Sequence, residues 1–209
     1  MDASGLDLFM MCEALRRSAF TSPPPGYHCR LCRRDELAVW KNLCVPDPRF
    51  TFVLDDYFTQ VYAPEGDLFF RRCTFLCDEN DQPVGTCFLW KAYGRILTLH
   101  WLRVLPAYEG RGLGRALLSE VLRPAADAAC PVFLHTHPAN ARAIHLYCDL
   151  GFRFLDAPAW IGYRPNGYQQ GYAYLRDVMP PELFAALPSP RPAPPTLLEA
   201  AASTRYEQF

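Results

Sequence analysis

The residues LPAYEGRGLGRALL at 105–118 constrain this chain more than any other stretch. An apolar run ends at Val104 just before them, and apolar residues recur every four positions from Leu113 onward. This pattern predicts a strand, a glycine-rich loop and a helix in that order. The backbone N–H groups of Arg111–Arg115 would then lie at a helix N-terminus, which favours a bound anion. Three residues without a Cβ would let the backbone approach a diphosphate closely: Gly110, Gly112 and Gly114.

The loop matches neither of the common nucleotide-binding patterns, because it lacks Gly-Lys-Ser/Thr and no second half-sheet of sufficient length follows. It also begins with a carboxylate, Glu109. A carboxylate within about 5 Å of a diphosphate costs on the order of 1–3 kcal/mol at effective dielectric constants of 20–80. Backbone N–H groups would still hold the anion, and Arg111 and Arg115 would offset the charge. We therefore expect weakened anion binding and not its loss.

The rest of the chain predicts alternating strands and helices within a main domain over residues 26–179. Residues 1–25 are expected to form a helical arm, with a helix over 6–17, and a proline linker outside the main fold. Residues 180–209 are proline-rich and suit a tail or strap. Hydrophobic periodicity and turn signals predict helices over 34–44, 54–63, 112–129 and 138–151, and strands over 27–33, 67–78, 82–93, 95–104, 131–137, 152–156 and 168–178.

Composition limits the function classes. The chain has 21 basic and 22 acidic residues, so it lacks the basic stripe that nucleic-acid binding requires. No apolar run reaches the roughly 18–20 residues that span a bilayer, and the acidic N-terminus does not resemble a signal peptide. Nine cysteines are an odd number, which favours reduced thiols and a cytoplasmic location. Zinc ligation by Cys29, Cys32, Cys73 and Cys77 is not expected, because their spacing on strands separates the side chains.

Two motifs together point to one family. The pattern L-x-V-x-P-x-Y-x-G-x-G-L-G starts at Leu102, and N-A-R-A-I-H-L-Y-C-D-L-G-F starts at Asn140. In order and separation they resemble the GCN5-related N-acetyltransferase (GNAT) family, over roughly residues 27–178 and most closely over 95–155. The resemblance implies an α/β fold with a mixed, mostly antiparallel, splayed sheet flanked by helices. Acetyl-CoA would bind where two central strands part, without a metal.

The resemblance also assigns the residues that would hold acetyl-CoA. The strand residues Leu102, Arg103 and Val104 would pair with the pantetheine arm. Asn140 would lie near the cofactor. The pyrophosphate would be wrapped by the loop residues Glu109, Gly110, Arg111, Gly112, Leu113, Gly114 and Arg115.

The implied reaction is direct attack of a primary amine on the acetyl thioester, with a small molecule, an amino acid or a peptide as acceptor. Such chemistry needs a base, donors for the oxyanion and an acid for the leaving sulfur. Tyr147 matches the tyrosine that usually serves as the acid, and a phenol of pKa near 10 can protonate a thiolate of pKa about 8.5. His100 lies where related enzymes often carry a glutamate or histidine base. The competing interpretation is a structural core histidine. His135 and His137 point to one face of a strand and could be metal ligands, but no third ligand is evident, so we interpret them as polar residues at the end of a loop.

Three functions and three tail arrangements remain open from sequence. The first function is N-acetyl transfer, and the second is a non-catalytic acyl-CoA sensor or regulatory module on the same fold. Glu109, the N-terminal arm and the tail favour the second, whereas the presence of Tyr147 and His100 opposes it. Transfer of a longer acyl group is the third. The tail could strap across its own domain, cover a neighbour in a homodimer, or float.

Overall fold

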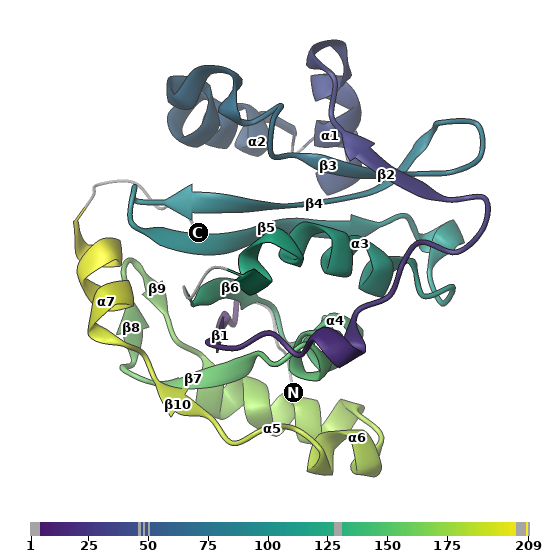
Figure 1. The fold of residues 1–209 in the computed structure, drawn as a ribbon. Helices are drawn as coiled ribbons and strands as arrows, with labels where there is room; N and C mark the ends of the chain where they lie inside the picture. The colour runs from purple at the N-terminus through teal and green to yellow at the C-terminus, as the bar shows by residue number, and fades with distance from the viewer. Residues whose placement is uncertain are drawn as a thin grey trace. The chain divides into compact units, whose positions relative to one another are not determined.

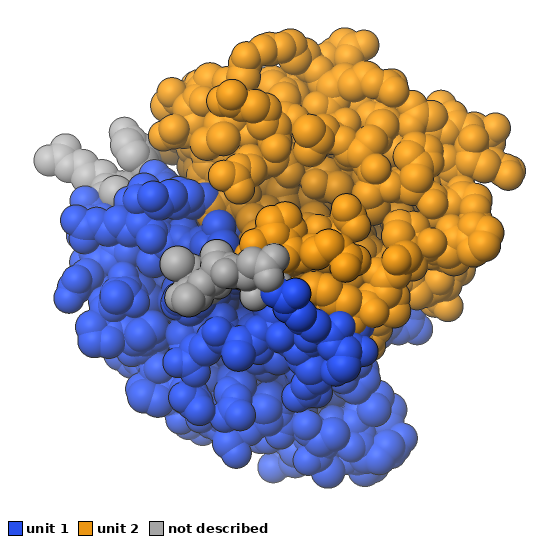
Figure 2. All heavy atoms as spheres, in the orientation of Figure 1, with its two compact units in different colours: residues 1–19, 91–98, 128–209 blue, residues 20–90, 99–127 orange. Residues whose placement is uncertain are grey.

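A computed structural model describes residues 5–45, 47, 49, 51–127, 131–203 and 208. The chain divides into two compact units, each built from separated segments (Figure 2). Unit 1 comprises residues 1–19, 91–98 and 128–209, and unit 2 comprises residues 20–90 and 99–127. Strands β4 (Pro83–Ala92) and β5 (Ile96–Val104) contribute residues to both units.

Unit 1 contains the ordered strands β10-β7-β1-β6-β5 (Figure 1). Strand β1 is antiparallel to both β6 and β7, β10 is parallel to β7, and β6 is parallel to the start of β5. The other regular elements among its described residues are a short hairpin, four α-helices and a 3-10 turn over Arg17–Ala19. The bounds in this unit are β1 (Leu8–Cys12), β6 (Val132–Thr136), α4 (Ala141–Asp149), β7 (Arg153–Ala157), β8 (Trp160–Ile161), β9 (Arg164–Pro165), α5 (Tyr168–Val178), α6 (Pro181–Ala185), β10 (Arg191–Pro192) and α7 (Pro195–Ala202).

The prediction of a helix over 6–17 was wrong. Leu8–Cys12 is strand β1, which lies inside the sheet between β6 and β7, so the described part of this segment is not an arm outside the fold. All five of its side chains are buried. A strand buried on both faces loses the alternation of apolar and polar residues, and periodicity alone cannot then distinguish it from a buried helix.

The prediction of a strand over 168–178 was also wrong, because these residues form α5. The buried residues Tyr168, Gly171 and Leu175 share one face of the helix, which packs on β1 and β7. A Cβ on Gly171 would come within 2.6 Å of the Leu8 side chain, so glycine permits this close approach. The segment is rich in tyrosine, which favours strands by propensity, and tertiary packing overrides that preference here.

The proline-rich segment after residue 180 is regular where it is described. Strand β10 extends the sheet beside β7, and α7 buries Leu197, Ala200 and Ala201. Ala201 lies against the hairpin, 3.2 Å from the position of a Cβ on Gly162. The described tail residues therefore pack across their own chain, which corresponds to the strap among the three arrangements considered.

Unit 2 contains the ordered strands β5-β4-β3-β2, with β2 antiparallel to β3 and β3 antiparallel to β4. The predicted helices over 34–44 and 54–63 are confirmed in outline, and the second continues into a π-helical turn over Phe58–Tyr62. The helix predicted over 112–129 ends before Pro124, as proline requires, and residues 128–129 lie outside the described part. The bounds are β2 (His28–Leu31), α1 (Leu37–Cys44), α2 (Thr51–Tyr57), β3 (Thr74–Cys77) and α3 (Leu113–Leu122).

Aromatic residues dominate the core of unit 2. Trp40 of α1 packs against Phe69, with ring centroids 4.9 Å apart, and also meets Phe88 of β4. Tyr62 closes the cluster and is fully buried. None of the described helices is both long and apolar enough to cross a bilayer.

Candidate functional site

The glycine-rich loop has a backbone that requires glycine at two positions. Strand β5 ends at Val104, a single 3-10 turn covers Pro106–Tyr108, and α3 begins after Gly112. Gly110 and Gly112 both have φ of +76°, in the left-handed region. A residue with a Cβ pays roughly 1–2 kcal/mol there. Because the first N–H groups of a helix have no intrahelical partner, the start of α3 presents donors suited to an anion.

Arg111 is held against the same loop. Its guanidinium donates to Tyr27 Oη and to the Ala107 carbonyl, each at 3.0 Å, and lies 5.4 Å from the centroid of the Tyr108 ring. Glu109 is exposed at the leading edge of the loop, and its backbone N–H donates to the Pro106 carbonyl at 3.3 Å. The Arg111 guanidinium is therefore held against the Pro106–Tyr108 turn that precedes Glu109.

The last residues of β5 are packed tightly against β4. A Cβ on Gly85 would lie 2.7 Å from the Arg103 carbonyl oxygen, so glycine is needed at that crossing. The Leu105 N–H donates to the Val84 carbonyl at 2.8 Å. The ladder that joins β5 to β6 covers Leu97 and Thr98, and Leu102–Val104 lie beyond those two residues along the strand.

A buried hydrogen-bonded group in unit 2 surrounds His100. Tyr62 Oη lies 2.6 Å from His100 Nδ1 and 2.8 Å from Trp101 Nε1. Consecutive residues of a regular strand point to opposite faces, yet these two contact one hydroxyl. The cause is the backbone of Trp101, whose φ of +52° interrupts the alternation. A bulky residue in this conformation is strained, and such strain is concentrated at functional sites.

The donor inventory fixes the direction of the hydrogen bond between Trp101 and Tyr62. Trp101 Nε1 can only donate, so Tyr62 Oη accepts from it. Burial raises the pKa of Tyr62 well above its ordinary value, so the phenol keeps its proton. Beside the bond from Trp101, the hydroxyl can donate to an unprotonated Nδ1 of His100 or accept an Nδ1–H, according to the histidine tautomer. In the tautomer with its proton on Nδ1, a neutral His100 keeps an unprotonated Nε2.

The residues of the second motif lie in unit 1, at the two ends of α4. Asn140 occupies the position before the helix, and its Nδ2 lies 3.4 Å from Thr136 Oγ1. Tyr147 is buried, with its ring centroid 5.8 Å from that of Phe152. Its carbonyl accepts the Phe152 N–H at 3.0 Å, which fixes the turn after the helix.

The structure therefore divides the predicted site residues into two groups. His100, Leu102–Val104 and Glu109–Arg115 belong to unit 2, and Asn140 and Tyr147 belong to unit 1. Sequence analysis missed Tyr62, which no motif includes and which meets His100 across 38 residues of sequence.

His137, His135, His28 and Cys77 lie outside the predicted site. His137 Nδ1 accepts the Ala139 N–H at 3.1 Å, and burial lowers the pKa of His135 to about 4. His28, Cys77 and Asp81 form one group of metal-ligand types, with ligand atoms within 4.8 Å of one another. However, the Asp81 carboxylate already accepts Arg30 at 2.7 Å, and burial raises the pKa of the Cys77 thiol to about 11. This chemistry does not favour a cation.

A strand that leads through a left-handed glycine loop into a helix makes this an α/β protein whose loop presents donors suited to an anion. The chain matches the acetyltransferase (GNAT) family over residues 37–152, which is more than half of its length. It belongs to that family, as the two motifs predicted.

Curated relatives match part of the chain. A thialysine N-epsilon-acetyltransferase of Sus scrofa is 32% identical over 97 residues, which are 41% of this chain and 57% of the relative. A mycothiol acetyltransferase of Kineococcus radiotolerans is 35% identical over 101 residues, or 48% of this chain and 32% of the relative. An uncharacterized N-acetyltransferase of Mycobacterium bovis is 34% identical over 84 residues, or 40% of this chain and 54% of the relative. The matched region thus spans between 32% and 57% of these relatives.

Solved structures support the fold. The GCN5-related N-acetyltransferase from Sphaerobacter thermophilus is similar with a TM-score of 0.53 and 21% identity, over 71% of this chain and 48% of that one. A GNAT-family acetyltransferase from Colwellia psychrerythraea gives a TM-score of 0.51 and 11% identity, over 71% of this chain and 52% of that one. The predicted fold class, a mixed sheet flanked by helices, is confirmed.

Proposed function

We propose that this protein is an acetyl-CoA-dependent N-acetyltransferase whose acceptor is the primary amine of a small molecule, an amino acid or a peptide. One observation carries the proposal. Strand β5 holds His100 in a hydrogen-bonded group at a left-handed residue, and the same strand ends in the glycine loop before α3. Family membership and the relatives named for thialysine and mycothiol acetylation support an amine as acceptor.

The loop fits the diphosphate of acetyl-CoA. Gly110 and Gly112 hold left-handed backbone conformations, and space is open around their Cβ positions. Acetyl-CoA would supply the acetyl thioester. The backbone of Leu102–Val104 would hold its pantetheine arm, residues Glu109–Arg115 would hold its pyrophosphate, and Asn140 would lie near it.

His100 is the proposed base. In the tautomer with its proton on Nδ1, His100 would donate to Tyr62 Oη, and its Nε2 would take a proton from the acceptor's ammonium group, directly or through water. An imidazole is suited to this step because its ordinary pKa lies near neutrality. Tyr62 is thus a positioning residue, since it acts through His100.

Tyr147 is the proposed acid. It holds a proton on its phenolic oxygen that a departing thiolate can take, and its place within the second motif supports this role. Tyr147 is only 6% exposed, so most of its surface is shielded from bulk water.

Thiol release during incubation with acetyl-CoA and a panel of primary amines tests the proposal. Wild type should turn over at least one amine, and Tyr147→Phe should lower kcat about 100-fold or more. Tyr163→Phe is the matched control, because Tyr163 is 58% exposed in the same unit. Binding of acetyl-CoA without turnover of any amine would favour the sensor, and failure to bind acetyl-CoA would refute the donor assignment.

A further inference from the structure

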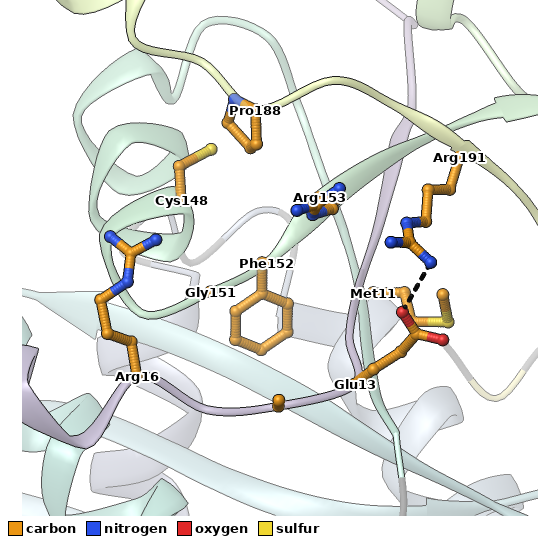
Figure 3. A pocket seen from close by; sticks show the side chains of 10 residues that line it. Met11, Glu13, Arg16, Cys148, Gly151, Phe152, Arg153, Pro188 and Arg191 are labelled. Carbon is orange, nitrogen blue, oxygen red and sulfur yellow. Dashed lines mark hydrogen bonds and ion pairs between the residues drawn. The ribbon is translucent and has the colours of Figure 1, made fainter.

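Unit 1 contains a second candidate site that the proposed reaction does not use. A cavity of about 280 Å³ lies where the end of α4 meets β7, the segment after β1 and the C-terminal segment (Figure 3). Arg16 and Arg191 stand on opposite sides of it, with Arg153 and Phe152 between them (Figure 3). The cavity therefore collects cations from three separate parts of the chain.

The charges around the cavity do not balance. Glu13 is the one carboxylate in the lining, and it lies 3.1 Å from an Arg191 nitrogen. Within the described residues, neither Arg16 nor Arg153 forms an ion pair. Nearby Asp149 lies 3.8 Å from His145 on its own helix and does not line the cavity. Three guanidinium groups against one carboxylate leave a formal charge of +2 in the lining.

Backbone contacts hold the Arg16 and Arg153 side of the cavity in place. The Arg16 N–H donates to the Leu150 carbonyl at 3.0 Å, so Arg16 is anchored at the end of α4. A Cβ on Gly151 would lie 2.7 Å from the Ala14 carbonyl oxygen, so glycine permits this close contact. Arg153 begins β7 directly after Phe152, whose side chain is fully buried. Two of the three cations therefore project from ordered backbone.

We propose that this cavity binds a small phosphomonoester. A phosphate dianion matches the formal charge of +2, and its oxygens can accept several guanidinium N–H groups at once. The cavity is larger than inorganic phosphate alone requires, and Met11 and Pro188 supply apolar lining for the organic part of the ester. The C-terminal segment, through Pro188 and Arg191, would then be fixed by the ligand.

Calorimetric titration of the full chain with glycerol 3-phosphate and with inorganic phosphate, at constant ionic strength, tests this assignment. Both should bind, and the ester should bind more tightly because Met11 and Pro188 line the space for its organic part. Arg16→Gln and Arg153→Gln should each weaken binding about tenfold or more, and Arg153→Lys should fall between wild type and Arg153→Gln. Arg176→Gln is the matched control, since Arg176 is exposed on α5 of the same unit and should not change binding.

One variant should act in the opposite direction. Glu13→Gln removes the partner of Arg191 and raises the formal charge to +3, so phosphate binding should tighten about threefold. A gain of affinity cannot result from misfolding. Gly112→Ala distinguishes the cavity from the α3 loop, because it should leave this binding unchanged. Three results would each overturn the assignment. They are no binding at about 10 mM ligand, wild-type affinity in both Arg16→Gln and Arg153→Gln, and loss of binding in Gly112→Ala.

Discussion

Tyr62→Phe is the most informative substitution for the proposed mechanism. The phenylalanine ring keeps the contacts that Tyr62 makes with Trp90 and Phe88, at centroid distances of 4.8 Å and 5.5 Å. What is lost is the hydroxyl, which lies 2.6 Å from His100 Nδ1 and 2.8 Å from Trp101 Nε1. The substitution therefore removes hydrogen bonding while leaving the packing largely intact.

The expected cost to stability is about 2–4 kcal/mol. A buried polar group that loses its partner costs roughly 1–3 kcal/mol, and two such groups are left here. The expected cost is smaller than the largest sum of these two penalties, because Trp101 is half-buried. Water can therefore reach its indole nitrogen more easily than it can reach His100. Urea unfolding measures this cost, with Tyr163→Phe as a control that should change stability by less than about 0.5 kcal/mol.

The expected effect on catalysis separates positioning from packing. A hydrogen bond from an imidazolium to Tyr62 is about twice as strong as one from a neutral imidazole. Losing it should favour the neutral form by about 1 kcal/mol and move the acidic limb of kcat/KM down by roughly 0.5–1 pH unit. The rate should also fall several-fold, because neutral His100 can then carry its proton on either nitrogen. A destabilised variant whose pH profile is unchanged would refute the role of Tyr62.

Three further predictions concern the loop and the sheet. Glu109→Gln should tighten acetyl-CoA binding, most clearly at low salt, and an unchanged Kd would mean that the carboxylate points away from the phosphates. Gly112→Ala should destabilise the protein by about 1–2 kcal/mol and weaken acetyl-CoA binding, because φ is +76° there; an alanine variant with wild-type affinity would contradict the role of the loop. Burial, followed by the charge of Arg164, lowers the pKa of His135 to about 4. The His135 imidazole therefore binds a proton more readily in the unfolded chain than in the folded protein. Its contribution to the free energy of unfolding is fully present above about pH 6.5 and is lost as the pH falls towards 4. His135→Gln should reduce the loss of stability between pH 6.5 and 4 by about 1–2 kcal/mol, after allowing for the partial exposure of the side chain. An equal loss in both proteins, measured by urea unfolding at each pH, would exclude His135 as its source.

Sequence patterns predicted the parts of the fold whose hydrophobic spacing is unambiguous. The loop after β5 and helix α3 lie where glycine spacing and apolar periodicity place them. The pattern failed for β1, where burial on both faces removes alternation, and for α5, where tyrosines suggest a strand. In α5 the buried residues Tyr168, Gly171 and Leu175 carry a helical spacing that was present in the sequence all along.

The site was less accessible to sequence because its geometry depends on one strained residue. Nothing in the letters HWL predicts a tryptophan at φ of +52°, a conformation uncommon for bulky side chains. Such a conformation costs of order 1–3 kcal/mol and persists only where the surroundings enforce it. Here Trp101 donates to Tyr62 and packs edge-on against Trp40 and Tyr57, at centroid distances of 6.0 Å and 5.8 Å. The aromatic core thus maintains the strained backbone of Trp101, and this backbone brings His100 and Trp101 to one hydroxyl. The core of unit 2 therefore helps to position the proposed base.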